Sequence, residues 1–586
     1  MKNSIESLLR EALESLPLDL VPAGARAVGI EVENTRDPSH GDLASNLAMR
    51  LAKAARQNPR KIAEALAAAL PPSKLVAKVQ IAGAGFINFF LRDDAYHQEL
   101  GKVLSEGASY GRSQLGAGKH MQVEFVSANP TGPLHVAHGR HAAFGASLSN
   151  LLDAVGFKVE REYYINDAGR QMDILAVSAW LRYLERCGER FVFPSNAYVG
   201  EYLLAVGDQL FAAEGLELKR SAAEIFDGLP PDEPQGGDKD VFIDALVDRA
   251  RSSLGEEAFA RVLRSALDGI VSDIREDLAE FGVTFDVWFS ERSLSDSGAI
   301  DRSLEALKNS GHAYLKDGAL WFKSTDFGDE KDRVMVRENG AKTYFASDIA
   351  YVLDKLERGF EHLTYIWGAD HHGYIARLRA VLLALEQPAE RFEVLLVQIV
   401  SLYRGGEKAK MSKRSGDYVT LRDLRMEVGN DAARLFYVMR SNDQHLDFDM
   451  ELAKSRSNEN PVYYIQYAHA RVSSVLRQLQ ERGLAHDVAH GLAHLGELGE
   501  AQELQLIKRI CAYPEFVELC ATQRAPHTLV HYLRDLANDF HTYYSAHQFI
   551  VDDAGTRNAR LDLALAAQTV IRNGLKLLGV SAPDTM

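Results

Sequence analysis

Two histidines, His135 and His138, lie three residues apart directly after a stretch of loop-forming residues. If a helix begins there, both side chains point the same way from its first turn. A helix N-terminus favours phosphate, and two imidazoles beside it can donate hydrogen bonds to phosphate oxygens whose charge grows in a transition state. We therefore expect His135 and His138 to be catalytic, with Gly132 and Gly139 leaving room for backbone or a flat base to approach closely.

This histidine pair has two other interpretations. It could be an ordinary surface pair, which the four-residue pattern alone would favour. It could also belong to a metal site, because Asp370, His371 and His372 supply further ligand types. Neither His-x-x-His nor Asp-His-His has a common zinc spacing, so we predict no protein-bound structural metal.

A second group of chemistry-bearing residues is Lys410-Met411-Ser412-Lys413, just after Gly405-Gly406. A loop with two ammonium groups can close over a triphosphate and neutralise a departing pyrophosphate. Alone, it could equally be a solvated basic loop. The histidine pair and the lysine loop together, in this order and context, indicate an ATP site far more specifically than either group alone. The sequence therefore predicts an ATP site in which Lys410 and Lys413 are catalytic and Met411 and Ser412 contact ATP.

The elements around these residues predict a nucleotide-binding α/β fold. Residues 121–126 alternate as a strand does, a loop and a helix over about 138–155 follow, and 158–165 is the next strand. A second strand–loop–helix unit begins at 363–368, and 394–402 is a further apolar strand candidate. Repeated units of this kind indicate a Rossmann-like doubly wound parallel sheet.

The length of 586 residues exceeds what one compact core accommodates. We expect an N-terminal α+β domain at 1–115, with a helical run over about 42–70. A catalytic domain would follow at 116–450, split by a helical insertion at about 183–301. Helical periodicity dominates from 451 to 586, which predicts a C-terminal all-α bundle.

Composition narrows the class of protein but not its partners. Hydrophobic residues make up 46% and charged residues 25%, and no apolar run approaches the ~18 residues that a membrane helix needs. Three cysteines, without disulfide or zinc spacing, fit a reducing cytoplasm. The net charge of -16 does not exclude a nucleic acid, since phosphate binding depends on local basic surface.

Longer segments resemble the arginyl-tRNA synthetase family, of the bacterial type and of class I, along nearly the whole chain. They are Val123 to Pro130, Tyr164 to Met172, Tyr344 to Tyr351, Trp367 to Gly373, Asp431 to Arg434, Tyr463 to Arg471 and Gly579 to Pro583. The family's histidine signature usually ends in His-x-Gly-His, so Ala137 is a departure that places one methyl group near the adenosine of ATP. Lys413 is present and the histidine loop contains no lysine, which matches a correlation within the family.

The resemblance also implies an arginine pocket. Positions matching Tyr344 and Asp348 hold the substrate side chain, and those matching Glu124 and Asn129 hold its backbone end. His371 would line the arginine or ribose pocket. A guanidinium gains most from bidentate bonding to an anionic, planar partner, and residues four apart share one helix face. The alternative for Tyr344 and Asp348 is a packed tyrosine beside an aspartate N-cap.

The implied reaction joins L-arginine to tRNA(Arg) through an arginyl-adenylate, with ATP and Mg²⁺, and tRNA would be needed before arginine is activated. The N-terminal domain would contact the elbow of tRNA, with Asn88 as a candidate. The C-terminal bundle would bind the anticodon, with Tyr463, Tyr467 and Met586 as candidates, although a helical tyrosine is more often part of a core. We expect a cytoplasmic monomer without membrane contact.

Three alternatives stay open at this point. The chain could be another class I synthetase with a different amino acid in its pocket. A nucleotidyltransferase would share the histidine loop but leave the helical C-terminus unexplained. A catalytically silent tRNA-binding paralogue is the third, and the intact Lys410, Lys413, Glu124 and Asp348 argue against it.

Overall fold

The structure is a computed structural model that describes residues 1–35, 37–409 and 419–586. Its contacts divide the chain into two units, each built from three separate segments. The first unit comprises Met1–Tyr110, Val472–Ala512 and Asp539–Val570, and the second comprises Gly111–Arg471, Tyr513–Asn538 and Ile571–Met586. The segment Lys410–Lys413 lies outside the described residues.

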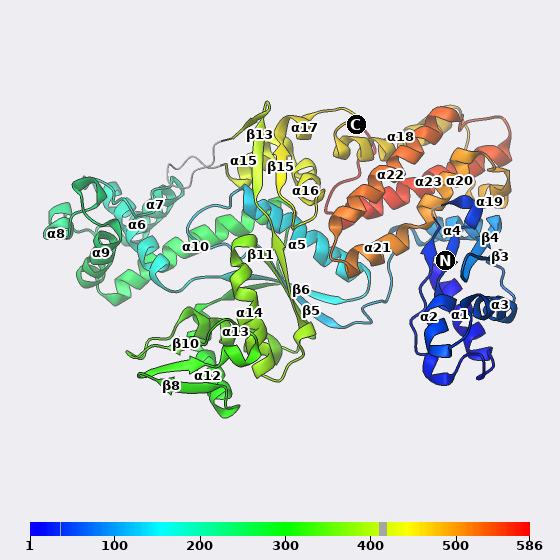
Figure 1. The fold of residues 1–586 in the computed structure, drawn as a ribbon. Coiled ribbons are helices and arrows are strands. Elements are labelled where there is room, and N and C mark those ends of the chain that lie inside the picture. Colours follow the sequence, from blue (N-terminus) through cyan, green and yellow to red (C-terminus); the bar gives the residue numbers. More distant parts are fainter. Residues whose placement is uncertain (36, 410–418) are drawn as a thin grey trace. The chain divides into compact units, whose positions relative to one another are not determined.

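A five-stranded parallel sheet forms the centre of the second unit (Figure 1), as the sequence predicted. Its strands are β5 (His120–Glu124), β6 (Lys158–Ile165), β7 (Val287–Ser290), β11 (His362–Gly368) and β12 (Phe392–Val397). Their order is β12-β11-β5-β6-β7, and every pairing is parallel. The chain proceeds from β5 to one side and later returns to the other, so the strand order reverses between β5 and β11. Such a reversal is where doubly wound sheets bind ligands.

Helices pack directly against this sheet. Helix α5 (Val136–Ala154) packs against β5, β6 and β11, and α14 (Ile375–Ala384) packs against β12. At Gly145 of α5, a Cβ atom would lie 2.3 Å from the ring of Phe125, so only glycine allows this helix to approach so closely. Helix α6 (Arg170–Arg186) follows β6, and α13 (Tyr344–Glu357) precedes β11.

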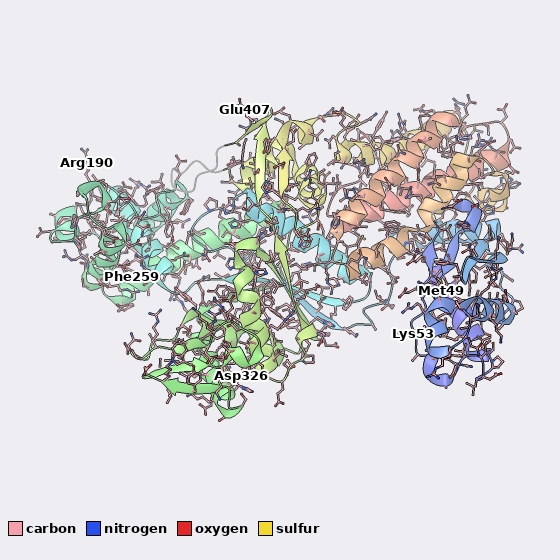
Figure 2. All side chains as sticks on the ribbon, viewed as in Figure 1. Met49, Lys53, Arg190, Phe259, Asp326 and Glu407 are labelled. Atoms are coloured by element: carbon pink, nitrogen blue, oxygen red, sulfur yellow. The ribbon has the colours of Figure 1, made fainter. Side chains whose placement is uncertain are left out.

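The segment between β6 and β7 is helical, with α7 (Tyr202–Glu214), α8 (Ala222–Phe226), α9 (Lys239–Leu254) and α10 (Glu256–Glu280) after α6. Phe259 of α10 is 2% exposed and its ring faces the Arg251 guanidinium at 4.3 Å (Figure 2). The expected insertion at about 183–301 extends too far, because β7 lies inside that range and pairs with β6 in the central sheet. Four residues without polar–apolar alternation gave no strand signal.

After β7 come α11 (Arg292–Asp296), α12 (Ala299–Asn309) and a small antiparallel sheet. Its strands are β8 (Ala313–Lys316), β9 (Ala319–Phe322) and β10 (Arg333–Val336), in the order β10-β9-β8. Phe322 and Met335 from this sheet share one apolar core with Phe345 and Ile349 of α13. The small sheet therefore supports the helix that carries Tyr344 and Asp348.

The expected strand at 394–402 is two strands in different sheets. Strand β12 ends at Val397, and β13 (Val400–Arg404) pairs with β14 (Glu407–Lys408) and β15 (Leu446–Asp449). Between them the carbonyl of Gln398 accepts a hydrogen bond from the buried Arg140 at 2.9 Å. A largely apolar run does not reveal such a break, because both of its parts have strand-like composition. Helices α15 (Leu421–Val428), α16 (Asn430–Val438) and α17 (Met450–Lys454) complete this region.

Residues 451–586, all of which the structure describes, contain helices and no strand, as predicted. The helices that follow α17 are α18 (Pro461–Glu481), α19 (Val488–Ala493), α20 (Ala501–Cys511), α21 (Tyr513–Thr522), α22 (Pro526–Ala546) and α23 (Ala554–Leu577). Among the described residues, no helix combines the length and apolar character that crossing a bilayer requires.

The first unit begins with an α+β fold. It contains α1 (Lys2–Ser15), β1 (Glu33–Asn34), β2 (Leu43–Ser45), α2 (Leu47–Ala55), α3 (Pro59–Ala69), β3 (Val76–Ala82), β4 (Phe86–Leu91) and α4 (Asp93–Glu106). The antiparallel sheet has the order β1-β2-β4-β3, and residues 5–91 bury their own apolar core. Within the same unit α4 packs against α20, where the Cys511 Sγ lies 3.9 Å from the carbonyl of Tyr96.

The predicted helical run over 42–70 is not continuous. It starts with strand β2, and the helical part is broken between α2 and α3. Arg56 has φ 51°, a left-handed conformation that ends α2, and Asn58 caps α3 by accepting a hydrogen bond from the N–H of Arg60 at 2.8 Å. Lys53 on α2 is exposed (Figure 2).

Candidate active site

Several of the candidate residues lie at the carboxyl edge of the central sheet. Glu124 ends β5, Ser290 ends β7 and is followed by Glu291, and Gly368 ends β11 and is followed by the Asp370-His371 segment. Because the strands are parallel, their carboxyl ends meet at one edge. The strand order reverses between β5 and β11, so the candidates gather at the position where this fold binds ligands.

The two histidines occupy the first turn of α5, as their spacing predicted. His135 is the N-cap, and its backbone N–H donates a hydrogen bond to the His138 Nδ1 at 3.3 Å. The two rings are stacked, with centroids 3.6 Å apart and planes 24° from parallel. Both imidazoles therefore lie beside the partial positive charge of the helix N-terminus, where a phosphate is favoured.

The chain that follows the lysine loop is joined to the histidine loop. His135 and Thr420 form an antiparallel bridge, and the N–H of Leu421 donates to the carbonyl of Leu134 at 2.8 Å. The residues 134–136 and 419–421, far apart in sequence, thus lie side by side. Lys410, Met411, Ser412 and Lys413 themselves lie outside the described residues, so their roles stay predictions.

The space left by the two glycines of the histidine loop is occupied by protein. A Cβ atom on Gly139 would lie 2.7 Å from Leu421 Cδ1 and 2.7 Å from the hydroxyl of Tyr437. A Cβ atom on Gly132 would lie 3.1 Å from the Tyr202 ring. The absence of a side chain at these two glycines therefore allows close protein packing, and their expected contact with ATP stays a prediction. Ala137 is partly exposed on the first turn of α5.

Tyr344 and Asp348 lie on one face of the first turns of α13. Thr343 is the N-cap, so the interpretation of Asp348 as an N-cap is wrong. Tyr344 is 62% exposed, and a Cβ atom on Gly169 would lie 2.9 Å from its hydroxyl. The segment after β6 therefore lies against the tyrosine.

Glu291, which sequence reasoning missed, forms an acidic cluster with Asp348. Burial, together with the charges of Glu291 and Glu124, raises the pKa of Asp348 to about 7. Burial and the charge of Asp167 raise the pKa of Glu291 to about 7, although hydrogen bonds from the hydroxyls of Tyr164 and Ser347 oppose this rise. Glu291 directly follows β7, and it was overlooked because that strand was assigned to the helical insertion.

Asn129 is held by the segment that follows β6. Its amide Nδ2 donates to Gln171 Oε1 at 3.0 Å, and its Oδ1 accepts from Asn166 Nδ2 at 3.3 Å. Asp167 in turn accepts a hydrogen bond from the N–H of Arg292 at 2.9 Å. The two family-like segments around Asn129 and Asn166 thus form one polar network.

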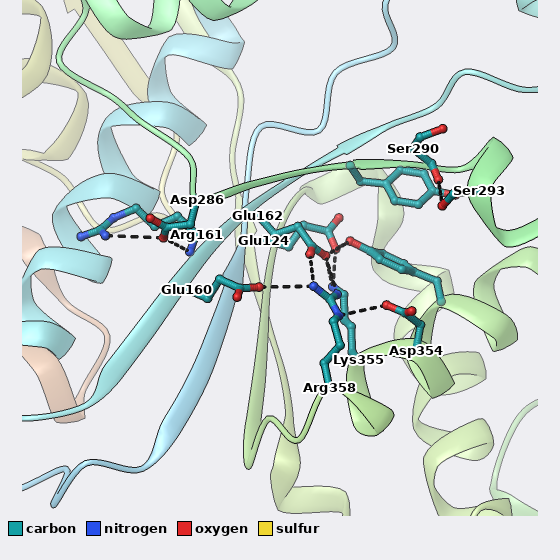
Figure 3. A network of polar contacts seen from close by, with 12 residues as sticks. Glu124, Glu160, Arg161, Glu162, Asp286, Ser290, Ser293, Asp354, Lys355 and Arg358 are labelled. Carbon is teal, nitrogen blue, oxygen red and sulfur yellow. Dashed lines mark hydrogen bonds and ion pairs between the residues drawn. The ribbon is translucent and has the colours of Figure 1, made fainter. Parts of the chain in front are cut away.

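Glu124 belongs to a buried ionic network that Figure 3 shows. Its carboxylate lies 2.6 Å from the Lys355 Nζ and accepts hydrogen bonds from Tyr351 at 2.9 Å and Ser127 at 3.2 Å. Sequence reasoning did not identify Lys355. Its pairing with Glu124 joins residues 231 positions apart, which no local pattern contains.

His371 follows β11 and is largely exposed, with its Nε2 3.8 Å from Asp370. Its ring centroid lies 6.1 Å from that of Trp367. His141, one turn after His138, also faces this region. Burial lowers the pKa of His141 to about 4, so this histidine is neutral near pH 7. The charge of Asp370 raises this pKa, and that of His371 lowers it.

Three of the tRNA candidates lie together in the second unit. The rings of Tyr463 and Tyr467 are stacked with centroids 5.6 Å apart, and the Arg471 guanidinium lies 4.4 Å from the Tyr467 ring. Tyr463 and Met586 line a cavity of about 620 Å³. Asn88, in β4 of the first unit, is 4% exposed, which argues against direct contact with RNA in this conformation.

Among the described residues, no group of three or more His, Cys, Asp or Glu side chains has an arrangement that could hold a metal ion. The Asp370-His371-His372 segment and the histidine loop do not form such a group. The absence of a structural metal stays a prediction.

Comparison with known proteins gives consistent matches. Family models match residues 3–91 ("Arginyl tRNA synthetase N terminal domain"), 99–189 and 247–461 ("tRNA synthetases class I (R), catalytic domain") and 465–586 ("DALR anticodon binding domain"). The arginine–tRNA ligase of Thioalkalivibrio sulfidiphilus is 58% identical over 586 residues and that of Coxiella burnetii 50%, each match covering 100% of both chains. The arginyl-tRNA synthetase structure from Thermus thermophilus, 22% identical, shares the fold with a TM-score of 0.74 over 100% of both chains.

Proposed function

Because this chain belongs to the arginyl-tRNA synthetase family, we propose that it attaches L-arginine to tRNA(Arg) through an arginyl-adenylate. The substrates are arginine, MgATP and tRNA, and the products are arginyl-tRNA, AMP and pyrophosphate.

The observation that carries this proposal is the acidic cluster at the carboxyl edge of the sheet. Asp348 and Glu291 each have a pKa raised to about 7, and Glu124 acts on Asp348. Carboxylates in such a place repel one another when ionised. A guanidinium relieves this repulsion and offers several donors in one plane. Tyr344 and Asp348 hold the arginine side chain, Glu124 and Asn129 its backbone end, and His371 lines the arginine or ribose pocket.

In the first step the α-carboxylate of arginine attacks the α-phosphorus of ATP and pyrophosphate leaves. The nucleophile is already an anion, so no general base is needed. The protein supplies alignment and charge: His135 and His138 donate to phosphate oxygens, and Lys410 and Lys413 neutralise the departing pyrophosphate together with its Mg²⁺.

In the second step the adenylate passes its arginyl group to the 2′-hydroxyl of the terminal ribose of tRNA. Tyr463, Tyr467 and Met586 bind bases of the anticodon loop, where stacked rings and an adjacent guanidinium suit unpaired bases. The cavity beside Tyr463 supports this role. Activation of arginine requires that tRNA be bound.

Each of the three domains has its own role in this reaction. Residues 1–115 bind the tRNA elbow, 116–450 catalyse the reaction and 451–586 read the anticodon. The enzyme acts as a monomer in the cytoplasm.

The deciding experiment is charging of total tRNA with each standard amino acid in turn, with and without unlabelled arginine as competitor. Arginine alone should be incorporated, and only arginine should compete. Incorporation of a different amino acid would identify another class I synthetase. Failure to charge tRNA in a single turnover would identify a silent tRNA-binding paralogue.

A further inference from the structure

Lys355 is a fully buried cation beside the proposed arginine site. Its side chain is 0% exposed, and its Nζ lies 2.6 Å from the Glu124 Oε2 and 3.7 Å from the Glu162 Oε1. The rings of Tyr351 and Tyr365 face the same ammonium at 4.1 and 3.8 Å. Taking an ammonium out of water is costly unless it is well paired, and the proposed reaction gives Lys355 no part.

The cations of this network are divided unequally between the two buried glutamates. Arg358, one turn after Lys355 on the same chain, lies 2.6 Å from Glu162 (Figure 3). Its other carboxylate partners are Glu160 and Asp354. Among the described residues, Lys355 is the one cation within ion-pair distance of Glu124. Glu162 therefore has two cations nearby, and Glu124 depends on one.

Glu124 and Glu162 are close enough to act on each other. The hydroxyl of Tyr351 is within hydrogen-bond distance of both carboxylates, and it has a single proton to donate. Burial, together with the charges of both glutamates, raises the pKa of Tyr351 well above its ordinary value, so the hydroxyl stays a donor. Two adjacent buried carboxylates repel each other, and the nearby cations and the Tyr351 hydroxyl offset this repulsion.

We propose that Lys355 is a positioning residue for the α-amino group of arginine, because its ammonium, 2.6 Å from Glu124, holds that carboxylate in place at the end of β5. The inference rests on the proposed function, in which Glu124 receives this amino group. Without Lys355, no described cation lies within ion-pair distance of Glu124, whereas Glu162 retains Arg358. The Glu124 carboxylate then loses the contact that fixes its orientation towards the ammonium of arginine.

The test is Lys355→Met in the full-length enzyme, measured by arginine-dependent pyrophosphate exchange in the presence of tRNA. We expect the KM for arginine to rise roughly 10- to 100-fold, the range for loss of a hydrogen bond to a charged group. The kcat and the KM for ATP should change less than about threefold, since uniform substrate binding is lost. Desamino-arginine, which lacks the α-amino group, should inhibit the wild type and the variant with equal inhibition constants.

Arg358→Met is the matched control, because it removes a cation from the same helix region and network without touching Glu124. It should leave the KM for arginine within about threefold of the wild type. The double variant Glu124→Gln with Lys355→Met removes both charges of the pair, and it should have the same KM for arginine as Glu124→Gln alone, because Lys355 acts through Glu124. This second variant decides the matter if Lys355→Met does not fold, as judged by its melting temperature.

Equal weakening of arginine and desamino-arginine, or an equal effect of Arg358→Met, would overturn the role of Lys355. If the proposed function itself is wrong, the result is different, because the wild-type enzyme would then show no arginine-dependent pyrophosphate exchange at all.

Discussion

Arginine binding should weaken as the pH falls from about 8 to about 6, because the acidic cluster must release protons to receive a guanidinium. Burial raises the pKa of both Asp348 and Glu291 to about 7. A guanidinium favours the ionised carboxylates, so the complex holds fewer protons than the free protein at these pH values.

The size of the effect follows from these two pKa values. A group with a pKa of about 7 is ~90% protonated at pH ~6 and ~10% protonated at pH ~8, so each proton that must leave costs about tenfold in affinity across this range. The charge of Glu291 contributes to the raised pKa of Asp348, so the two protons are not released independently. The dissociation constant should therefore rise between about 10- and 100-fold from pH ~8 to pH ~6.

Asp348 and Glu291 also determine whether the stability of the folded protein rises or falls with pH. Their folded-state pKa values are above the ordinary values of 3.8 and 4.5, so the folded protein holds protons that the unfolded chain has released. Stability without arginine should fall as the pH rises from about 4 to about 7. Saturating arginine should offset this loss, which thermal unfolding with and without arginine would measure.

The assay is titration calorimetry near pH 7 in two buffers with different protonation enthalpies, which reports the number of protons released. Asp348→Asn should reduce that number. Asp354→Asn is the matched control: it lies on the same helix, burial also raises the pKa of Asp354, and its partner is Arg358 at 3.0 Å. The control should release as many protons as the wild type. No proton release and a flat affinity between pH ~6 and ~8 would refute the reasoning.

Three further predictions concern other parts of the molecule. Gly139→Ala should destabilise the protein by about 1–3 kcal/mol in urea unfolding, because the added Cβ would lie 2.7 Å from the Tyr437 hydroxyl; unchanged stability would mean that the helices can separate freely. Lys413→Ala should lower the kcat of pyrophosphate exchange roughly 10²- to 10³-fold while arginine binding measured by calorimetry stays the same, and an unaltered rate would remove its assigned role. Tyr463→Ala should weaken tRNA binding about tenfold in a filter assay, and a loss of arginine affinity instead would show that it acts elsewhere.

The parallel sheet and the site at its edge were accessible to sequence reasoning because their signals are local. Residues 121–126 alternate and are followed by a loop of turn-forming residues, and the histidine spacing indicates the start of α5. The spacing of four places Tyr344 and Asp348 on one face if the segment is helical, and α13 meets that condition. Each of these predictions depends on residues that are neighbours in the chain.

What the sequence did not reveal depends on contacts between distant segments. Strand β7 has four residues and its identity comes from pairing with β6, so Glu291 could not be placed at the sheet edge. The break between β12 and β13 is fixed partly by Arg140, which lies 258 residues from Gln398. Lys355 reads as one more charge on a helix until the fold brings Glu124 to it.

The pairing of α4 with α20 has a consequence for how the chain is made. Tyr96 and Cys511, which meet there, are 415 residues apart. Ribosomes add about 5–20 residues per second, so α4 emerges roughly 20–80 s before its partner helix exists. Residues 5–91 can bury their own core during this time, but Leu100 and Val103, both buried in the finished protein, cannot. The apolar face of α4 therefore lacks its partner helix throughout synthesis of the catalytic region.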